Sequence, residues 1–155
     1  MILTETELVL WGEEIGREVV PPVVLALRGS LGAGKSVLAR AVARGAGVEG
    51  HIPSPTFNLV FRYQGTVADV VHMDLYRIRQ PSELEELGWD ELGSTEEILL
   101  IEWPERAGDR LPEDRWDIEL KVTDELPGLR EISVRRVGSP PRLPSFPIAL
   151  APGGR

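Results

Sequence analysis

An eight-residue stretch, Gly29-Ser30-Leu31-Gly32-Ala33-Gly34-Lys35-Ser36, contains the residue types that bind a polyphosphate. It matches the pattern G-x-x-x-x-G-K-[ST] of a phosphate-binding loop, or P-loop, in full. Glycines let the backbone curl so that its N–H groups face an anion. Lys35 adds a positive charge for the β- and γ-phosphates, and the Ser36 hydroxyl can ligate Mg²⁺. The stretch therefore predicts a site for a nucleoside triphosphate.

Two carboxylates directly follow apolar runs that are typical of buried strands. Glu102 comes after Ile98–Ile101, and Asp74 comes after Val70–Met73. Ligands of open α/β sheets bind outside the carboxyl ends of the strands, so both acids are expected beside the P-loop. There they could hold Mg²⁺ and orient an attacking water. Either residue could instead be a solvated carboxylate that ends a strand, because the chain has 25 acidic residues.

A proline-fixed loop over residues 51–56 offers one more candidate, Thr56. Pro53 and Pro55 keep this loop out of regular helix. A switch segment at this place in the chain would carry a hydroxyl towards the γ-phosphate and Mg²⁺. The alternative is that Ser-Pro-Thr forms only a turn.

Hydrophobic periodicity predicts the elements that position these residues. A capping box at Thr4 and Glu7 begins a helix over residues 5–18. The P-loop lies between a buried strand over 23–27 and an amphipathic helix from Ser36 to about Gly45, which is the context that the motif requires. The remaining expected elements are a β-hairpin over 59–63 and 67–73, a helix from 81 to about 88, a strand over 98–101, and two late strands over 116–122 and 130–137 that could form a second hairpin.

Length and composition set the frame for these elements. A chain of 155 residues fits one domain, which we place over residues 1–137. Residues 138–155 hold five prolines and few apolar anchors, so we expect an extended or disordered tail.

The charge and the residue types point to a cytoplasmic location. The formal net charge of −8 argues against tight independent binding of nucleic acid or of an anionic membrane. The absence of Cys suits a reducing compartment. We find neither a secretion signal nor an apolar run of the roughly 20 residues that span a bilayer.

Taken in order, five stretches resemble the bacterial TsaE family, also called YjeE. They are residues 31–36 of the P-loop, Ser54-Pro55-Thr56-Phe57, His72-Met73-Asp74-Leu75-Tyr76-Arg77, Glu83-Leu84 through Leu87-Gly88, and Ile101-Glu102-Trp103-Pro104-Glu105. The resemblance covers roughly residues 4–137. It implies a P-loop NTPase fold, a three-layer α/β/α arrangement with a mixed parallel and antiparallel central sheet.

The resemblance also implies an activity. It implies a slow, partner-dependent ATPase that uses ATP and Mg²⁺ and works with the TsaB and TsaD proteins in the biosynthesis of threonylcarbamoyladenosine in tRNA. Hydrolysis would support repeated turnover of that complex, and tRNA would be held mainly by the partners, in agreement with the negative net charge.

Carried over by position, the family's functional residues fall on named residues of this chain. Lys35 would contact the phosphates, Ser36 would bind Mg²⁺, and Asp74 would be the Walker-B-type acid. Glu102 would act on the Mg²⁺ side or orient water, and Thr56 would lie in the switch loop. The nucleotide would further contact the rest of the binding set, which is Gly29, Leu31, Gly32, Ala33, Gly34, Val37, Arg130 and Glu5, the last near the adenine.

The chain departs from the family pattern at two positions in and beside the loop. Ser30 stands where the family usually has Asp, and Val37 where it often has Thr. Neither group is needed to cradle phosphates, so the departures bear on control of hydrolysis or on partner contacts.

Two other functions stay open on the residues alone. A small-molecule kinase would usually carry a lid that supplies arginines, whereas residues 80–97 are acidic. A non-hydrolytic switch that binds nucleotide to assemble a complex is the second, because Glu102 alone does not prove turnover. Trp103 is expected either to touch nucleotide or partner or to pack in the core. We interpret His72 as a hydrogen-bonded structural residue.

Overall fold

One mixed sheet organises the protein. The computed structural model describes residues 1–53, 59–92 and 96–145. In this part of the chain seven strands lie in the order β1-β7-β6-β2-β5-β4-β3. Their bounds are β1 Ile2–Thr4, β2 Val23–Arg28, β3 Val60–Tyr63, β4 Asp69–Asp74, β5 Glu97–Glu102, β6 Arg115–Val122 and β7 Leu129–Val137.

The centre of the sheet is parallel and its edges are antiparallel. β2 pairs in parallel with both β5 and β6, and β5 pairs in parallel with β4. The pairs β3–β4, β6–β7 and β1–β7 are antiparallel. The carboxyl ends of β2, β4 and β5 therefore meet at one edge of the sheet, which is where such folds bind ligands.

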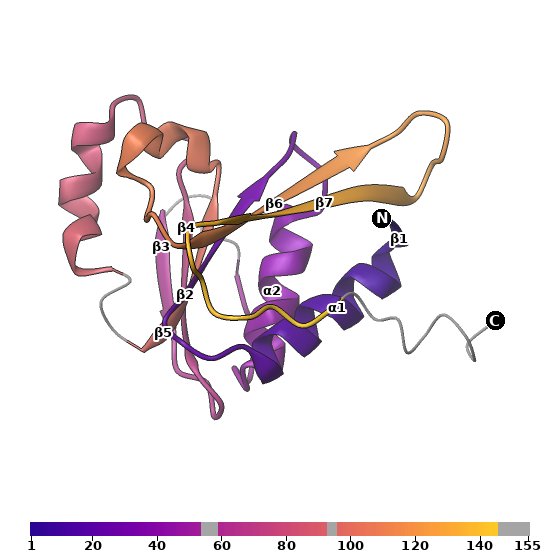
Figure 1. Cartoon of the computed structure of the whole chain (residues 1–155), viewed down its shortest axis with the longest axis horizontal. Coiled ribbons are helices and arrows are strands. Elements are labelled where there is room, and N and C mark those ends of the chain that lie inside the picture. Colours follow the sequence, from indigo (N-terminus) through magenta and orange to yellow (C-terminus); the bar gives the residue numbers. More distant parts are fainter. Residues whose placement is uncertain (54–58, 93–95, 146–155) are drawn as a thin grey trace.

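Two α-helices cover one face of the sheet, α1 (Glu5–Glu18) and α2 (Lys35–Gly45), as Figure 1 shows. The Thr4 hydroxyl accepts the Glu7 N–H, and the Glu7 carboxylate accepts the Thr4 N–H, which completes the predicted capping box. Apolar residues of both helices pack with those of the sheet into one core.

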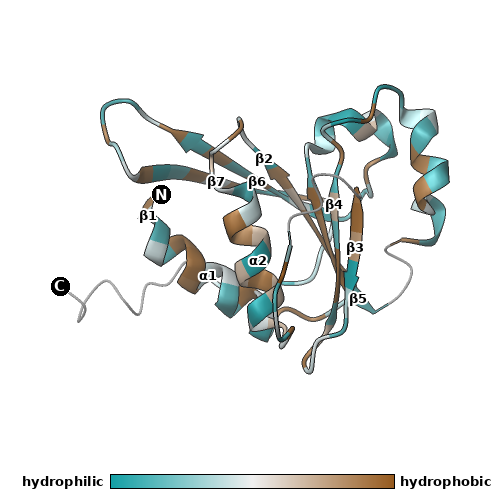
Figure 2. Cartoon of the chain, turned by 180° about the vertical axis from the view of Figure 1, so that it is seen from behind, coloured by the Kyte–Doolittle hydropathy of each residue, from teal (hydrophilic) through white to brown (hydrophobic). Residues whose placement is uncertain are grey.

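The opposite face is covered by short 3-10 helices and has a core of its own. These helices are η1 (Pro81–Leu87), η2 (Trp89–Glu91) and η3 (Pro104–Arg110). Alternate residues of β5 point to the two cores, with Ile98 and Leu100 on the side of α1 and α2 and Leu99 and Ile101 on the other. Figure 2 shows the resulting apolar central strands between the two layers. The expected α/β class and mixed central sheet are confirmed, and the third layer is made of 3-10 rather than α-helices.

Four local features differ from the sequence predictions, and two of them are the unpredicted 3-10 helices η2 and η3. β1 was not predicted, and it exists because Ile2, Leu3 and Thr4 pair with the distant residues 129–131 of β7. The helix expected from Pro81 has 3-10 geometry, and the Glu83 carboxylate closes its start by accepting the backbone N–H of Gln80 at 3.0 Å. The described residues contain no helix long and apolar enough to cross a membrane.

After β7, residues 138–145 form neither helix nor strand and return to the body of the protein (Figure 1). The Trp116 indole donates to the Pro141 carbonyl at 2.8 Å, and the Trp11 indole donates to the Pro144 carbonyl at 3.4 Å. Leu143 packs against the core beneath α1 and α2. These contacts tie the described part of the C-terminal segment to α1 and β6, and residues 146–155 lie outside the described residues.

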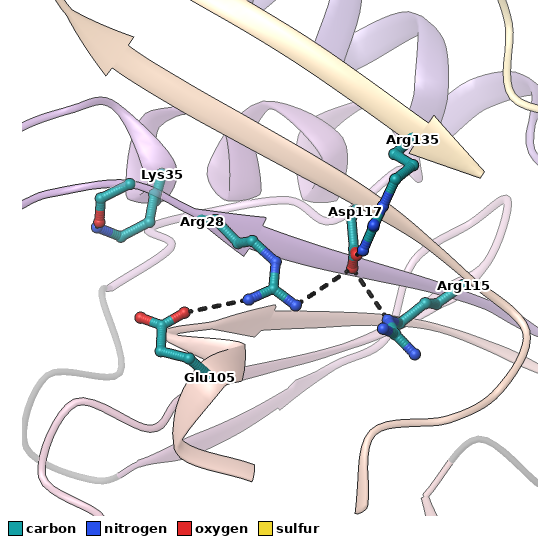
Figure 3. A network of polar contacts seen from close by, with 7 residues as sticks. Arg28, Lys35, Glu105, Arg115, Asp117 and Arg135 are labelled. Atoms are coloured by element: carbon teal, nitrogen blue, oxygen red, sulfur yellow. Dashed lines mark hydrogen bonds and ion pairs between the residues drawn. The ribbon is translucent and has the colours of Figure 1, made fainter. Parts of the chain in front are cut away.

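An ionic network surrounds Asp117 of β6, whose side chain is 5% exposed (Figure 3). Asp117 lies on the face of β6 opposite to Ile118, which packs in the core under α1 and α2. Its carboxylate lies 2.7 Å from Arg135 of β7, 3.0 Å from Arg115 and 3.6 Å from Arg28 of β2. Arg28 also lies 3.5 Å from Glu105 of η3. The network therefore links β2, β6, β7 and η3.

We predict that Asp117→Asn lowers the free energy of unfolding at pH 7 by about 1–3 kcal/mol. Burial by itself raises the pKa of Asp117, but the hydrogen bonds from Arg135 and Arg115 and the charge of Arg28 outweigh it, so that the pKa lies below its ordinary value of 3.8. A carboxyl whose pKa is lowered by folding adds stability above its unfolded pKa and loses that contribution as the pH falls through its folded pKa.

The difference between wild type and Asp117→Asn should accordingly be constant near neutral pH and shrink below about pH 4 in urea titrations at several pH values. Asp124→Asn, at an exposed position between β6 and β7, makes the same charge change and should have little effect. A difference that stays constant down to pH 2 would contradict the assignment.

Candidate functional site

The P-loop connects the carboxyl end of β2 to the first residue of α2. Its turn needs glycines, because Gly29 has φ 149° and Gly34, the N-cap of α2, has φ 108°. A Cβ at position 29 would also lie 2.5 Å from the Leu120 carbonyl oxygen. Residues with a Cβ rarely adopt such backbone conformations, so the loop depends on its glycines. The loop consequently lies at the positive end of the α2 dipole.

Lys35 lies inside the site and is 5% exposed. Its ammonium donates to the carbonyl oxygens of Gly29 and of Ser30, the latter at 2.9 Å. It also lies 4.2 Å from the centre of the Trp103 ring, within the range of a cation–π contact. The one lysine of the loop is thus held among neutral carbonyls and an aromatic ring.

The two predicted acids lie next to each other, in register on β4 and β5. Asp74 is 8% exposed, Glu102 is 2% exposed, and they are paired positions of the parallel ladder. The Ser36 hydroxyl donates to Glu102, with its oxygen 3.1 Å and 3.2 Å from the two carboxylate oxygens. The Asp74 carboxylate accepts the backbone N–H of Tyr76 at 2.9 Å. Hydroxyl and carboxylate oxygens therefore converge at the start of α2.

Burial disfavours the charged forms of two site residues. It lowers the pKa of the Lys35 ammonium, against the opposing charges of Glu102, Glu105 and Asp74. It raises the pKa of the Asp74 carboxyl, which the Tyr76 N–H counteracts and the charge of Glu102 reinforces. A polyphosphate beside the ammonium and a divalent cation beside the carboxylates would each favour the charged form.

These groups line one cavity of about 370 Å³. Its floor is the P-loop and the start of α2, from Leu31 to Val37, with Asp74 and Glu102 on one side. The other side is formed by Glu5, Leu8 and Arg130. The volume is in the range of small-molecule and cofactor sites.

Arg130 reaches the P-loop from β7. Its guanidinium donates to the Ala33 carbonyl oxygen at 2.9 Å and to that of Gly32 at 3.5 Å. Glu5, at the start of α1, lines the same cavity. Two residues that were placed near the nucleotide only by resemblance thus lie at the cavity, although they are 125 positions apart in the chain.

The cavity wall also contains residues for which the sequence indicated no role of their own. Tyr76 and Arg77 follow Asp74, and Leu8 belongs to the core-facing stripe of α1. Trp103 packs against the core under the 3-10 helices, as one of its two alternatives expected, and it also lines the cavity. The Tyr76 and Trp103 rings lie 4.9 Å apart. The sequence signal that could have placed Tyr76 and Trp103 at the site is their position just after Asp74 and Glu102.

Most of the predicted site residues come together in this way. Gly29 lies at the base of the loop and is not part of the cavity wall. Its carbonyl oxygen accepts a hydrogen bond from the Lys35 ammonium. Thr56 and its neighbours Ser54, Pro55 and Phe57 lie outside the described residues. His72 is hydrogen-bonded, as expected, and its partner is Glu102.

A glycine-rich loop between a central parallel strand and a helix, at the edge where two acids emerge, defines a P-loop nucleotide-binding fold. The family model described as "Threonylcarbamoyl adenosine biosynthesis protein TsaE" matches residues 2–132. The chain therefore belongs to the TsaE family.

Curated relatives and a solved structure agree with this assignment. The chain is similar to the tRNA threonylcarbamoyladenosine biosynthesis protein TsaE of Treponema pallidum, with 36% identity over 80% of this chain and 90% of the relative. It is also similar to the TsaE proteins of Haemophilus influenzae, 35% identical over 75% and 73% of the two chains, and of Bacillus subtilis, 36% identical over 77% and 73%. The crystal structure of Bacillus subtilis YdiB superposes with a TM-score of 0.74 and 28% identity, covering 89% of this chain and 84% of that one.

Proposed function

We propose that this protein is the ATP-binding and ATP-hydrolysing subunit that supports threonylcarbamoyladenosine modification of tRNA. The observation that carries the proposal is the cavity in which Lys35, Ser36 and the N-terminus of α2 face two buried carboxylates. The names of the TsaE relatives support a role in the biosynthesis of threonylcarbamoyladenosine in tRNA. The cavity supports nucleotide binding, because a helix N-terminus suits the phosphates of a triphosphate.

The donor set fits Mg²⁺ together with ATP. Among the described residues no group of three or more His, Cys, Asp or Glu forms a complete metal cage. Mg²⁺ does not need one, since it usually keeps waters and is held by one or two carboxylates and by substrate phosphates. Ser36, Asp74 and Glu102 offer only oxygen atoms, which are the ligands that Mg²⁺ prefers. When bound, the ion would neutralise charge on the phosphates.

Each site residue that the structure describes has a proposed role that its position supports. Lys35 would exchange its contacts with loop carbonyls for the β- and γ-phosphates, and Ser36 would turn its hydroxyl to Mg²⁺. Asp74 would serve as the Walker-B-type acid. Glu102 would orient the attacking water or contact the Mg²⁺ shell. Thr56 remains a proposed switch-loop residue.

The other end of the nucleotide would lie between α1 and β7. Leu8 and Val37 give this part of the cavity an apolar surface that suits a base. Glu5 is proposed to lie near the adenine, and Arg130 to approach the nucleotide from β7.

The partners are proposed to be the TsaB and TsaD proteins, with tRNA reached only through that complex. The net charge of −8 supports the indirect contact, because direct binding of tRNA would require clustered cations. In this arrangement hydrolysis resets the complex and does not perform the carbamoyl transfer.

Release of phosphate from ATP tests the proposal. We expect slow release by the full chain alone and faster release when purified TsaB and TsaD are added. ADP formation that depends on a small-molecule acceptor would instead identify a kinase. Tight ATP binding without hydrolysis under any of these conditions would identify a non-hydrolytic switch.

A further inference from the structure

A buried histidine lies behind Glu102 and takes no part in the proposed chemistry so far. His72 lies in β4 and is 1% exposed. Side chains of a strand alternate between its two faces, so His72 shares a face with Asp74, two residues further on. That face is the one on which α2 packs, because Val70 belongs to the core under α1 and α2.

The imidazole of His72 contacts the Glu102 carboxylate directly. Its Nε2 lies 2.5 Å from Oε2 of Glu102, and the exposed fractions of the two side chains are 2% and 3%. His72 is in register with Leu100 in the parallel ladder, so the contact runs diagonally to the residue two positions on. Since a carboxylate only accepts hydrogen bonds, Nε2 of His72 is the donor.

The contact matters because Ser36 also donates to the same carboxylate. A buried carboxylate deprived of hydrogen-bond donors is costly and can rotate away from its position. In the proposed function the Ser36 hydroxyl turns to Mg²⁺ when the nucleotide binds and stops donating to Glu102. The hydrogen bond from His72 does not depend on this exchange.

We propose that His72 is a positioning residue for ATP hydrolysis, which fixes one oxygen of Glu102 and so leaves the other aimed at the reaction site. The proposal rests on the proposed ATPase function. It assigns His72 no contact with substrate, and its effect should therefore fall on turnover rather than on nucleotide binding.

The first test uses the nucleotide-free full chain with ¹⁵N-labelled histidine. The chain has two histidines, and His51→Gln, at an exposed loop position, assigns their signals. Proton–nitrogen correlations should show a proton on Nε2 of His72, and Glu102→Gln should shift this signal while leaving that of His51 unchanged. An unprotonated Nε2, or a His72 signal that does not shift in Glu102→Gln, would overturn the proposal.

The second test compares two substitutions of His72 in the partner-stimulated ATPase. His72→Leu removes the donor and keeps an apolar volume, and it should lower kcat about 10- to 100-fold with KM changed less than about 3-fold. His72→Gln keeps an N–H donor near the position of Nε2 and should restore most of the loss. His51→Gln is the control and should behave as wild type.

A double-mutant cycle separates positioning from a merely structural role. In the Glu102→Gln background His72→Leu should cause less than about a 2-fold further loss, because there is no carboxylate left to position. An equal loss in both backgrounds, or full activity of His72→Leu, would overturn the proposal. If wild type itself never hydrolyses ATP, it is the proposed function that fails, and the tautomer measurement still reports on the hydrogen bond.

Discussion

Lys35→Ala is expected to weaken binding of magnesium–ATP at least about 100-fold, which corresponds to roughly 2.7 kcal/mol. Lys35 lies at the N-terminus of α2, lines the cavity and is 5% exposed. A charge-assisted hydrogen bond from its ammonium to a phosphate is strong. Isothermal titration calorimetry with a nonhydrolysable ATP analogue measures the effect without turnover.

The loss of binding should not come with a loss of folding. Burial already disfavours the charged form of Lys35, so removing the ammonium should leave the unfolding transition close to that of wild type. Lys121→Ala removes an exposed lysine that pairs with Glu119, and it provides a matched control with unchanged affinity. Unchanged affinity in Lys35→Ala would contradict the assignment of the P-loop.

Glu102→Gln is expected to lower kcat for ATP hydrolysis about 10²- to 10³-fold while the dissociation constant of the ATP analogue changes less than about 3-fold. The amide has nearly the same shape and can still accept from Ser36 and His72. It lacks the negative charge that orients water in the transition state. Single-turnover hydrolysis in the presence of the partner proteins separates the chemical step from product release.

Asp74→Asn should show the same pattern, because Asp74 lies in register with Glu102. Glu119→Gln, on the exposed part of β6, is the control for loss of one negative charge. If Glu102→Gln weakened binding as much as hydrolysis, its role would lie in the ground state and not in the transition state.

The parts of the site that the sequence predicted are those that depend on local pattern. The turn of the P-loop has positive φ values at its glycines, which residues with a Cβ rarely adopt. The glycine pattern therefore predicts the turn directly. Asp74 and Glu102 each end an apolar run, and parallel strands bring their carboxyl ends to one edge. The capping box at Thr4 followed from an equally local signal. The fold class, by contrast, was implied by the resemblance to the TsaE family.

The parts that were not predicted depend on pairing between distant residues. β1 has three residues, and only its partners in β7 make it a strand. The contact of His72 with Glu102 requires the register of β4 against β5, which periodicity does not give. The cation–π contact between Lys35 and Trp103 depends on a backbone turn at Trp103, with φ 56° and ψ 50°, that few non-glycine residues adopt. The pattern at residues 81–87 predicts a helix but does not distinguish 3-10 from α geometry.

A crystal structure of the full chain with Mg²⁺ and a nonhydrolysable ATP analogue would show whether the P-loop binds the triphosphate. We expect the triphosphate to lie in the cavity, with phosphate oxygens accepting from the backbone N–H groups of the P-loop and from the Lys35 ammonium. An empty P-loop with the analogue bound in another cleft would contradict this expectation.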